Sequence, residues 1–149
     1  MSQAIAPAAV AVSPVSSKRP VASKRVLAGR ILTGLSLLFL TFDGAIKFYI
    51  AKLPNFDEKL TLGFSLDAMP KLGAILLACT ALYAFPRTAV LGAVLLTGYL
   101  GGAVATHMRV GGPAFSLLFP FIVGAVVWGG LFLRDDRLAA FLPWSKRAE

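Results

Sequence analysis

Four long apolar segments constrain this chain more than any other feature of its sequence. They cover about residues 26–46, 67–85, 89–106 and 115–133. An α-helix rises 1.5 Å per residue, so a segment of ~21 residues is ~31 Å long and crosses the hydrocarbon core of a bilayer. Backbone groups in lipid must bond within their own segment, which favours helices. The sequence therefore predicts an all-α membrane protein, a bundle of four transmembrane helices.

The composition agrees with this class of protein. Hydrophobic residues make up 57% of the chain and charged residues 15%, whereas soluble domains carry about 25% charged residues. The net charge is +8, but the basic residues flank the apolar segments and line no groove, which is typical of membrane topology signals and not of nucleic-acid binding. The expected partner is the lipid bilayer. The single cysteine, Cys79, excludes a disulfide and is interpreted as an apolar packing residue.

The chain divides into one domain and two tails. Residues 1–25 are rich in Ala, Val, Ser and Pro and end in basic residues, the reverse of a secretory signal. They predict a disordered basic N-terminal tail. Residues 26–143 form the four-helix domain, and residues 144–149 a short basic tail. The polar connection from about residue 47 to 66 is too long for a simple loop, so it carries a short interfacial helix or covers the end of the bundle.

The distribution of lysine and arginine predicts the orientation. Four spans put both termini on one side. If that side is the cytoplasm, ten basic residues lie inside and five outside, in agreement with the positive-inside rule. The inner set is Lys18, Arg19, Lys24, Arg25, Arg30, Arg87, Arg134, Arg137, Lys146 and Arg147, and the outer set is Lys47, Lys52, Lys59, Lys71 and Arg109. The prediction is that both the N and the C termini are cytoplasmic.

This four-span topology gathers polar residues at one end of the bundle. That end is here called the polar mouth, and the prediction places it on the outer side of the membrane. The candidate ligand-binding residues there are Asp43, Lys47, Lys71, Tyr99, Thr106, His107 and Arg109. Ionisable groups at membrane depth are costly and are functional candidates by default. Asp43 and Lys47 are four residues apart and are expected to form an ion pair on one helix face. The alternative is that Asp43 pairs with a cation or with His107 across the bundle.

His107 is the only histidine, and it shares a helix face with Tyr99. One interpretation is an interfacial residue with satisfied hydrogen bonds. The other is proton exchange or a hydrogen bond to a quinone carbonyl, because histidine exchanges protons near neutral pH. A lone histidine predicts neither a metal site nor a haem site. Phosphate loops, nucleophile triads and zinc signatures do not occur in the sequence, so no catalytic residue is assigned.

Small residues recur along the third span and predict close helix packing. They are Ala93, Thr97, Gly98, Gly101 and Gly102. In lipid, small residues let helix backbones approach and gain dispersion contacts. The third span is therefore expected to lie at the centre of the bundle. The pattern serves packing within one chain and dimerisation equally well.

Three stretches of the sequence resemble the DoxX-like family of small four-helix membrane proteins. They are FDGAIKF at residues 42–48, ACTALYAFPRTAVLGAVLLTGYLGGAVATHMRVGGP at residues 78–113, and LFP with WGGLFLRDDRLAAFLP towards the end. By this resemblance, the Asp43/Lys47 pair and the segment from Thr106 to Arg109 match polar motifs of the family. Relatives often carry a glutamate in the second span where this chain has Leu76, which argues against a carboxylate-dependent role of that helix.

The resemblance implies an association with membrane redox complexes and a multi-pass location in the bacterial inner membrane. The leading hypothesis is an accessory subunit, not a catalyst on its own, that binds a quinone, a lipid or a redox partner protein at the polar mouth. The first alternative is a structural or assembly membrane protein, and a homo-oligomer is a further possible partner. The second is a small-solute transporter, which requires polar residues through the bilayer midplane. There, spans one, three and four offer almost only Ser36, Thr97 and glycines.

The four-span topology predicts that Arg87 and His107 face opposite aqueous compartments. In a Cys79→Ala background, Arg87→Cys and His107→Cys should react with a membrane-impermeant thiol reagent from opposite sides of sealed vesicles. Labelling of both cysteines from the same side contradicts the four-span arrangement.

Overall fold

The computed structural model describes residues 21–53, 61–135 and 138. This part of the chain contains α1 (Val21–Ile50), the short 3-10 helix η1 (Leu66–Ala68), α2 (Met69–Ala84), α3 (Ala89–Arg109) and α4 (Ala114–Arg134). Four helical segments in it are long and apolar enough to cross a membrane. The predicted four-helix fold is confirmed, and the protein is a multi-pass membrane protein.

α1 and α3 extend several residues beyond the predicted spans. α1 begins at Val21, so residues 21–25 are helical and the predicted N-terminal tail is too long at its C-terminal end. Lysine, arginine and alanine are good helix formers, and the nearest helix breaker before them is Pro20. The remainder of that tail and the predicted tail at 144–149 lie outside the described residues. α3 continues to Arg109, which puts Thr106, His107 and Arg109 on the helix itself.

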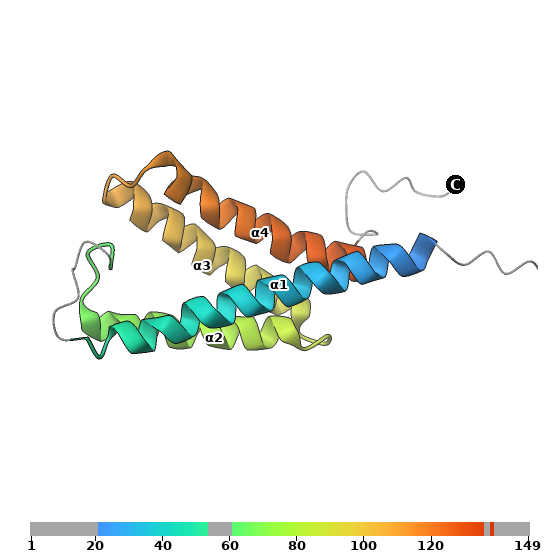
Figure 1. Ribbon diagram of the computed structural model, residues 1–149, viewed down its shortest axis with the longest axis horizontal. Helices are drawn as coiled ribbons and strands as arrows, with labels where there is room; N and C mark the ends of the chain where they lie inside the picture. The colour runs from blue at the N-terminus through green and yellow to red at the C-terminus, as the bar shows by residue number, and fades with distance from the viewer. Residues whose placement is uncertain (1–20, 54–60, 136–137, 139–149) are drawn as a thin grey trace, which may run out of the picture.

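The four helices are arranged as two pairs that meet at one end and separate at the other. α1 packs against α2 and α4, and α3 packs against the same two helices. Figure 1 shows the α1/α2 pair and the α3/α4 pair converging near the start of α1 and diverging where α1 and α3 end. The diverging end is the polar mouth.

Large side chains fill the space between the helices. The largest fully buried ones are Tyr83, Leu40, Leu76, Leu96, Leu131 and Val127. The Tyr83 hydroxyl donates a 2.8 Å hydrogen bond to the Val127 carbonyl, which ties α2 to α4. Among the described residues, every buried side-chain nitrogen and oxygen has a hydrogen-bond partner. A satisfied polar group is needed there because a buried unpaired one costs ~1–3 kcal/mol.

Glycines on all four helices make close helix contacts, and a Cβ added at Gly92 of α3 would overlap the Tyr83 backbone of α2. A Cβ added at Gly73 would lie 2.7 Å from the Gly44 carbonyl oxygen, and one at Gly29 would lie 2.9 Å from the Arg134 backbone nitrogen. A Cβ at Gly130 would lie 2.9 Å from the Thr33 hydroxyl. Real Cβ atoms do not approach so closely, so only glycine permits these α1–α2, α1–α4 and α2–α3 contacts. The most extensive helix contacts are those of α1.

The small residues of α3 behave differently from the prediction. Ala93 is fully buried and packs in the core. A Cβ added at Gly98, Gly101 or Gly102 would meet nothing within 4 Å in the described part of the chain. The prediction of close packing within the chain is therefore wrong for these three glycines, although the first half of α3 lies in the core. Residues four apart on a helix with 3.6 residues per turn are rotated by ~40° about its axis. A row of small residues with this spacing that begins in the core therefore ends on the outer face of α3. Packing between copies stays a prediction.

Leucine substitutions should separate these two kinds of glycine. Gly73→Leu should lower the stability of the purified protein by about 1–3 kcal/mol, because the new side chain must push α1 and α2 apart. Gly98→Leu, on the open face of α3, is the matched control and should leave the thermal midpoint in detergent unchanged or slightly raised. Equal losses in both variants would contradict the glycine contacts described above.

Candidate functional site

A cavity of about 510 Å³ lies between the diverging helix pairs at the polar mouth. Its volume falls within the range of ~300–1,000 Å³ that is usual for small-molecule sites. Its apolar lining comprises Phe39, Leu40, Ile46 and Ile50 of α1, Leu62 and Phe64 of the connection, Met69 and Leu72 of α2, Leu100 and Ala103 of α3, and Phe119, Pro120 and Val123 of α4. All four helices therefore contribute to this site.

The polar lining contains five of the seven predicted site residues, namely Asp43, Lys47, Tyr99, Thr106 and His107. Lys71 and Arg109 lie at the same end of the bundle, but they are exposed and are not part of the lining. Lys71 is on the first turn of α2. The structure thus brings five predicted residues together around one cavity and leaves two outside it.

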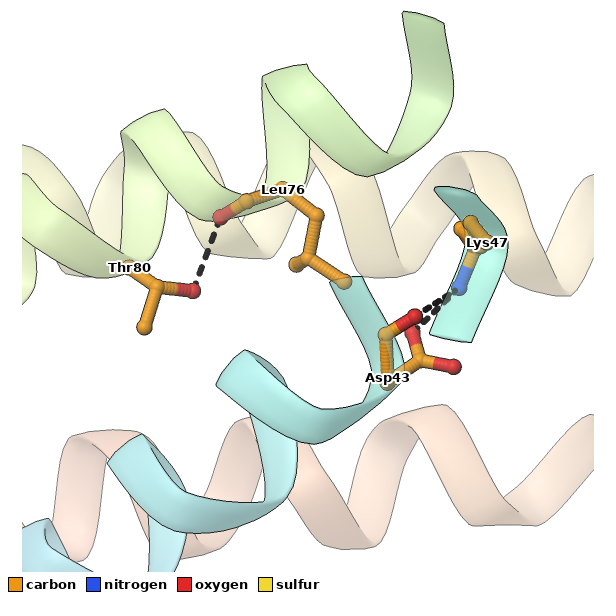
Figure 2. A network of polar contacts seen from close by, with 4 residues as sticks. All are labelled: Asp43, Lys47, Leu76 and Thr80. Carbon is orange, nitrogen blue, oxygen red and sulfur yellow. Dashed lines mark hydrogen bonds and ion pairs between the residues drawn. The ribbon is translucent and has the colours of Figure 1, made fainter. Parts of the chain in front are cut away.

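Asp43 and Lys47 form the expected ion pair on α1. The Lys47 Nζ lies 2.5 Å from the Asp43 Oδ2 and also donates a 3.1 Å hydrogen bond to the Asp43 backbone carbonyl (Figure 2). Within the described part of the chain, no hydrogen bond joins Asp43 to His107. The ion-pair interpretation is confirmed, and it neutralises the only lysine and the only carboxylate of the cavity lining.

Leu76 faces the same part of α1 from α2. It is fully buried, and the Thr80 hydroxyl donates a 2.8 Å hydrogen bond to its carbonyl. Figure 2 shows the Leu76 side chain directed towards the turn of α1 that carries Asp43. An apolar side chain here adds no further charge beside the Asp43–Lys47 pair.

Tyr99 and His107 present unengaged polar groups to the cavity. The two residues lie on one face of α3, two turns apart. In residues 21–53 and 61–135, no hydrogen bond or ion pair is made by either side chain. The Thr106 hydroxyl, beside them, donates a 2.8 Å hydrogen bond to the Gly102 carbonyl. The phenol of Tyr99 and the imidazole of His107 are therefore available to a ligand, each with a donor and an acceptor.

Arg109 holds a segment of the connection over the polar mouth. Its Nη2 donates a 3.2 Å hydrogen bond to the Leu62 carbonyl, and its guanidinium lies 5.9 Å from the centre of the Phe64 ring. Leu62 and Gly63 both have positive φ, 57° and 78°. A leucine in this conformation is unusual and needs tertiary contacts to hold it. Because Thr61, Leu62 and Phe64 line the cavity, this segment covers the mouth, one of the two expectations for the connection.

Several residues of the site carried no signal in the sequence. Phe39 of α1 and Phe119 of α4 form an edge-to-face contact with ring centres 5.5 Å apart. Outside the cavity lining, Trp128 of α4 donates a 2.9 Å hydrogen bond to the Thr97 hydroxyl of α3. An apolar residue that lines a cavity has the same sequence pattern as one that faces lipid. In the described residues, no group of three or more His, Cys, Asp and Glu residues is placed to hold a metal ion.

Comparison with known proteins gives one match. The DoxX-like family matches residues 31–130, which include Asp43, Lys47, Tyr99, Thr106 and His107. No curated protein and no solved structure matches the chain.

The ion pair of the cavity should show strong coupling in a double-mutant cycle. Asp43→Asn leaves the partly buried Lys47 ammonium without its counter-ion. Lys47→Met leaves the Asp43 carboxylate without its counter-ion. Each should lower stability by about 1–3 kcal/mol. The double variant should be less destabilised than the sum of the two, since it leaves no unpaired charge. Thermal denaturation in detergent measures the cycle, with exposed Lys71→Met as a near-neutral control. Additive effects would show that the pair does not stabilise the mouth.

Proposed function

The chain belongs to the DoxX-like family, and we propose that this multi-pass membrane protein is an accessory subunit of a membrane redox system that binds a quinone headgroup in the cavity at the polar mouth. The observation that carries the proposal is the pair of unengaged side chains, Tyr99 and His107, in a cavity whose remaining lining is mostly apolar. A pocket of this kind suits a flat apolar ring with a few hydrogen-bonding groups.

The chemistry of a quinone matches the polar groups on α3. Its two carbonyl oxygens accept hydrogen bonds, and the Tyr99 hydroxyl and a ring N–H of His107 are donors. The apolar faces of the ring would pack against the aliphatic and aromatic side chains of α1 and α4. Histidine also exchanges protons near neutral pH, which suits a ligand that takes up protons when it is reduced.

The charge of the cavity favours a neutral ligand. Lys47 is already paired with Asp43 at 2.5 Å, and Arg109 is engaged with Leu62 and Phe64 on the exposed side of the mouth. An anionic headgroup would need an unpaired cation to offset its loss of water. A quinone carries no charge and has no such requirement.

Ligand binding is favoured over solute permeation by the packing beneath the cavity. Tyr83, Leu96 and Leu131 are almost completely buried in the converging half of the bundle. The Tyr83 hydroxyl there is bonded to the Val127 carbonyl. A transport path needs free polar groups or broken helices at this depth. The buried side chains there are mostly apolar, and the hydroxyls of Thr33, Ser36 and Thr80 are engaged in hydrogen bonds.

The proposal includes an orientation and a place. The excess of lysine and arginine on the side of the termini supports cytoplasmic termini and a polar mouth on the outer side of a bacterial inner membrane. A quinone in the cavity would then lie near the outer surface of that membrane. The family resemblance supports the redox partner.

The experiment is extraction and titration of the purified protein. Protein prepared in mild detergent should release a quinone into organic solvent, identified by mass spectrometry. Titration of stripped protein with a benzoquinone, followed by tryptophan fluorescence, should saturate. Tyr99→Phe and His107→Ala should each weaken binding by roughly 3- to 10-fold, as expected for one lost hydrogen bond.

Lys71→Ala is the matched control, because Lys71 lies at the same end of the bundle but outside the cavity. It should bind the quinone as the unsubstituted protein does. The proposal is wrong if no quinone is released and no saturable binding is observed, or if all three variants bind with unchanged affinity.

A further inference from the structure

A second, shallower hollow lies beside the cavity, on the surface between α3 and α4. It has a volume of about 310 Å³, and its wall includes Leu100 and Pro120, which also line the cavity at the polar mouth. This hollow is here called the lateral groove. One face of Leu100 and Pro120 therefore borders the cavity, and the other borders a groove that opens towards the membrane.

We propose that the lateral groove holds the polyprenyl tail of a quinone whose headgroup occupies the cavity, with the tail leaving between Leu100 and Pro120. This inference rests on the proposed function. A long-chain quinone needs a continuous path from a polar pocket to the lipid, and the cavity and the groove share Leu100 and Pro120 as a common wall.

The lining of the groove suits a hydrocarbon chain. Its two polar side chains satisfy one another and the backbone: the Trp128 Nε1 donates a 2.9 Å hydrogen bond to the Thr97 hydroxyl, which donates a 2.8 Å hydrogen bond to the Ala93 carbonyl. The remaining lining consists of glycine, alanine and apolar side chains. An apolar occupant therefore leaves no side-chain donor of the groove unpaired.

Two glycines give the groove its depth. A Cβ at Gly101 would meet nothing within 4 Å in the described residues, and a Cβ at Gly124 would lie 3.7 Å from the Leu100 Cδ1. Lipid chains are as apolar as leucine, so a site in the membrane gains affinity from close packing and not from leaving water. Glycines on α3 and α4 allow that packing. They also make Gly101 a position where a larger side chain fits the fold and fills the groove.

Pro120 makes the shared wall easier to move. A proline inside a helix has no N–H for the carbonyl four residues earlier, and helices bend at such positions. Pro120 lies within the second turn of α4 and is itself buried. Bending of α4 at this residue therefore costs less than elsewhere in the helix, because one backbone hydrogen bond is already missing.

The test compares two probes with the same headgroup: a benzoquinone with a long polyprenyl tail, and the same quinone with a methyl group in place of the tail. Both are titrated in detergent against the unsubstituted protein, Gly101→Phe and Gly98→Phe. Gly98 is the matched control, since it is equally open on α3 but lines neither the groove nor the cavity. Gly124→Leu probes the opposite wall.

We expect the tailed quinone to bind the unsubstituted protein about tenfold more tightly than the tail-less one. Gly101→Phe and Gly124→Leu should remove this difference and leave the affinity for the tail-less quinone unchanged, while Gly98→Phe changes neither affinity. The inference is overturned, and the proposed function stands, if the unsubstituted protein binds both probes equally or if Gly101→Phe leaves the difference intact. A dimer that Gly101→Phe converts to a monomer also overturns it, because the groove then holds a second copy. Failure of both probes to bind the unsubstituted protein overturns the proposed function as well.

Discussion

Close contact of α1 with both of its neighbours is the constraint on which the site depends. In lipid, helices gain little from burying apolar surface, so they associate through close packing and buried hydrogen bonds. Gly29 and Gly130 bring α1 against α4 at the converging end, and Gly44 and Gly73 bring α1 against α2 near the polar mouth. α1 contacts α4 through glycines at the converging end and through the larger Phe39–Phe119 ring pair nearer the mouth, where the α3/α4 pair diverges. The cavity occupies the space that this divergence opens.

The polar residues of the mouth have distinct roles although they are close together. Asp43 and Lys47 neutralise each other, and Arg109 holds the segment that covers the cavity. Tyr99 and His107 remain available, because nothing else in the described structure engages them. A site that uses its charges for structure and its neutral groups for recognition is suited to an uncharged ligand. The lateral groove extends that site to the lipid. The headgroup of one amphipathic molecule would bind in the cavity, and its tail would bind in the groove.

Much of the fold and part of the site follow from local patterns. The four spans depend on length and hydropathy, which are properties of each segment alone, and the structure reproduces them within a few residues. The Asp43–Lys47 pair depends on a spacing of four residues on one helix. The gathering of Tyr99, Thr106 and His107 at the same end as this pair depends on the alternating direction of the spans. None of these features requires knowledge of how the helices pack.

Only the tertiary structure decided which faces of those helices meet. The sequence by itself did not distinguish Gly73, which contacts the backbone of α1, from Gly98, which contacts nothing in the described chain, because both are glycines in apolar helices. It also did not separate Lys71 from the cavity lining, or show that Arg109 binds the Leu62 carbonyl. In a membrane protein, apolar residues face both the lipid and the interior, so the usual alternation of polar and apolar faces is missing. The chain therefore determined that there are four spans with one polar end, and the packing of the helices determined the cavity and the groove.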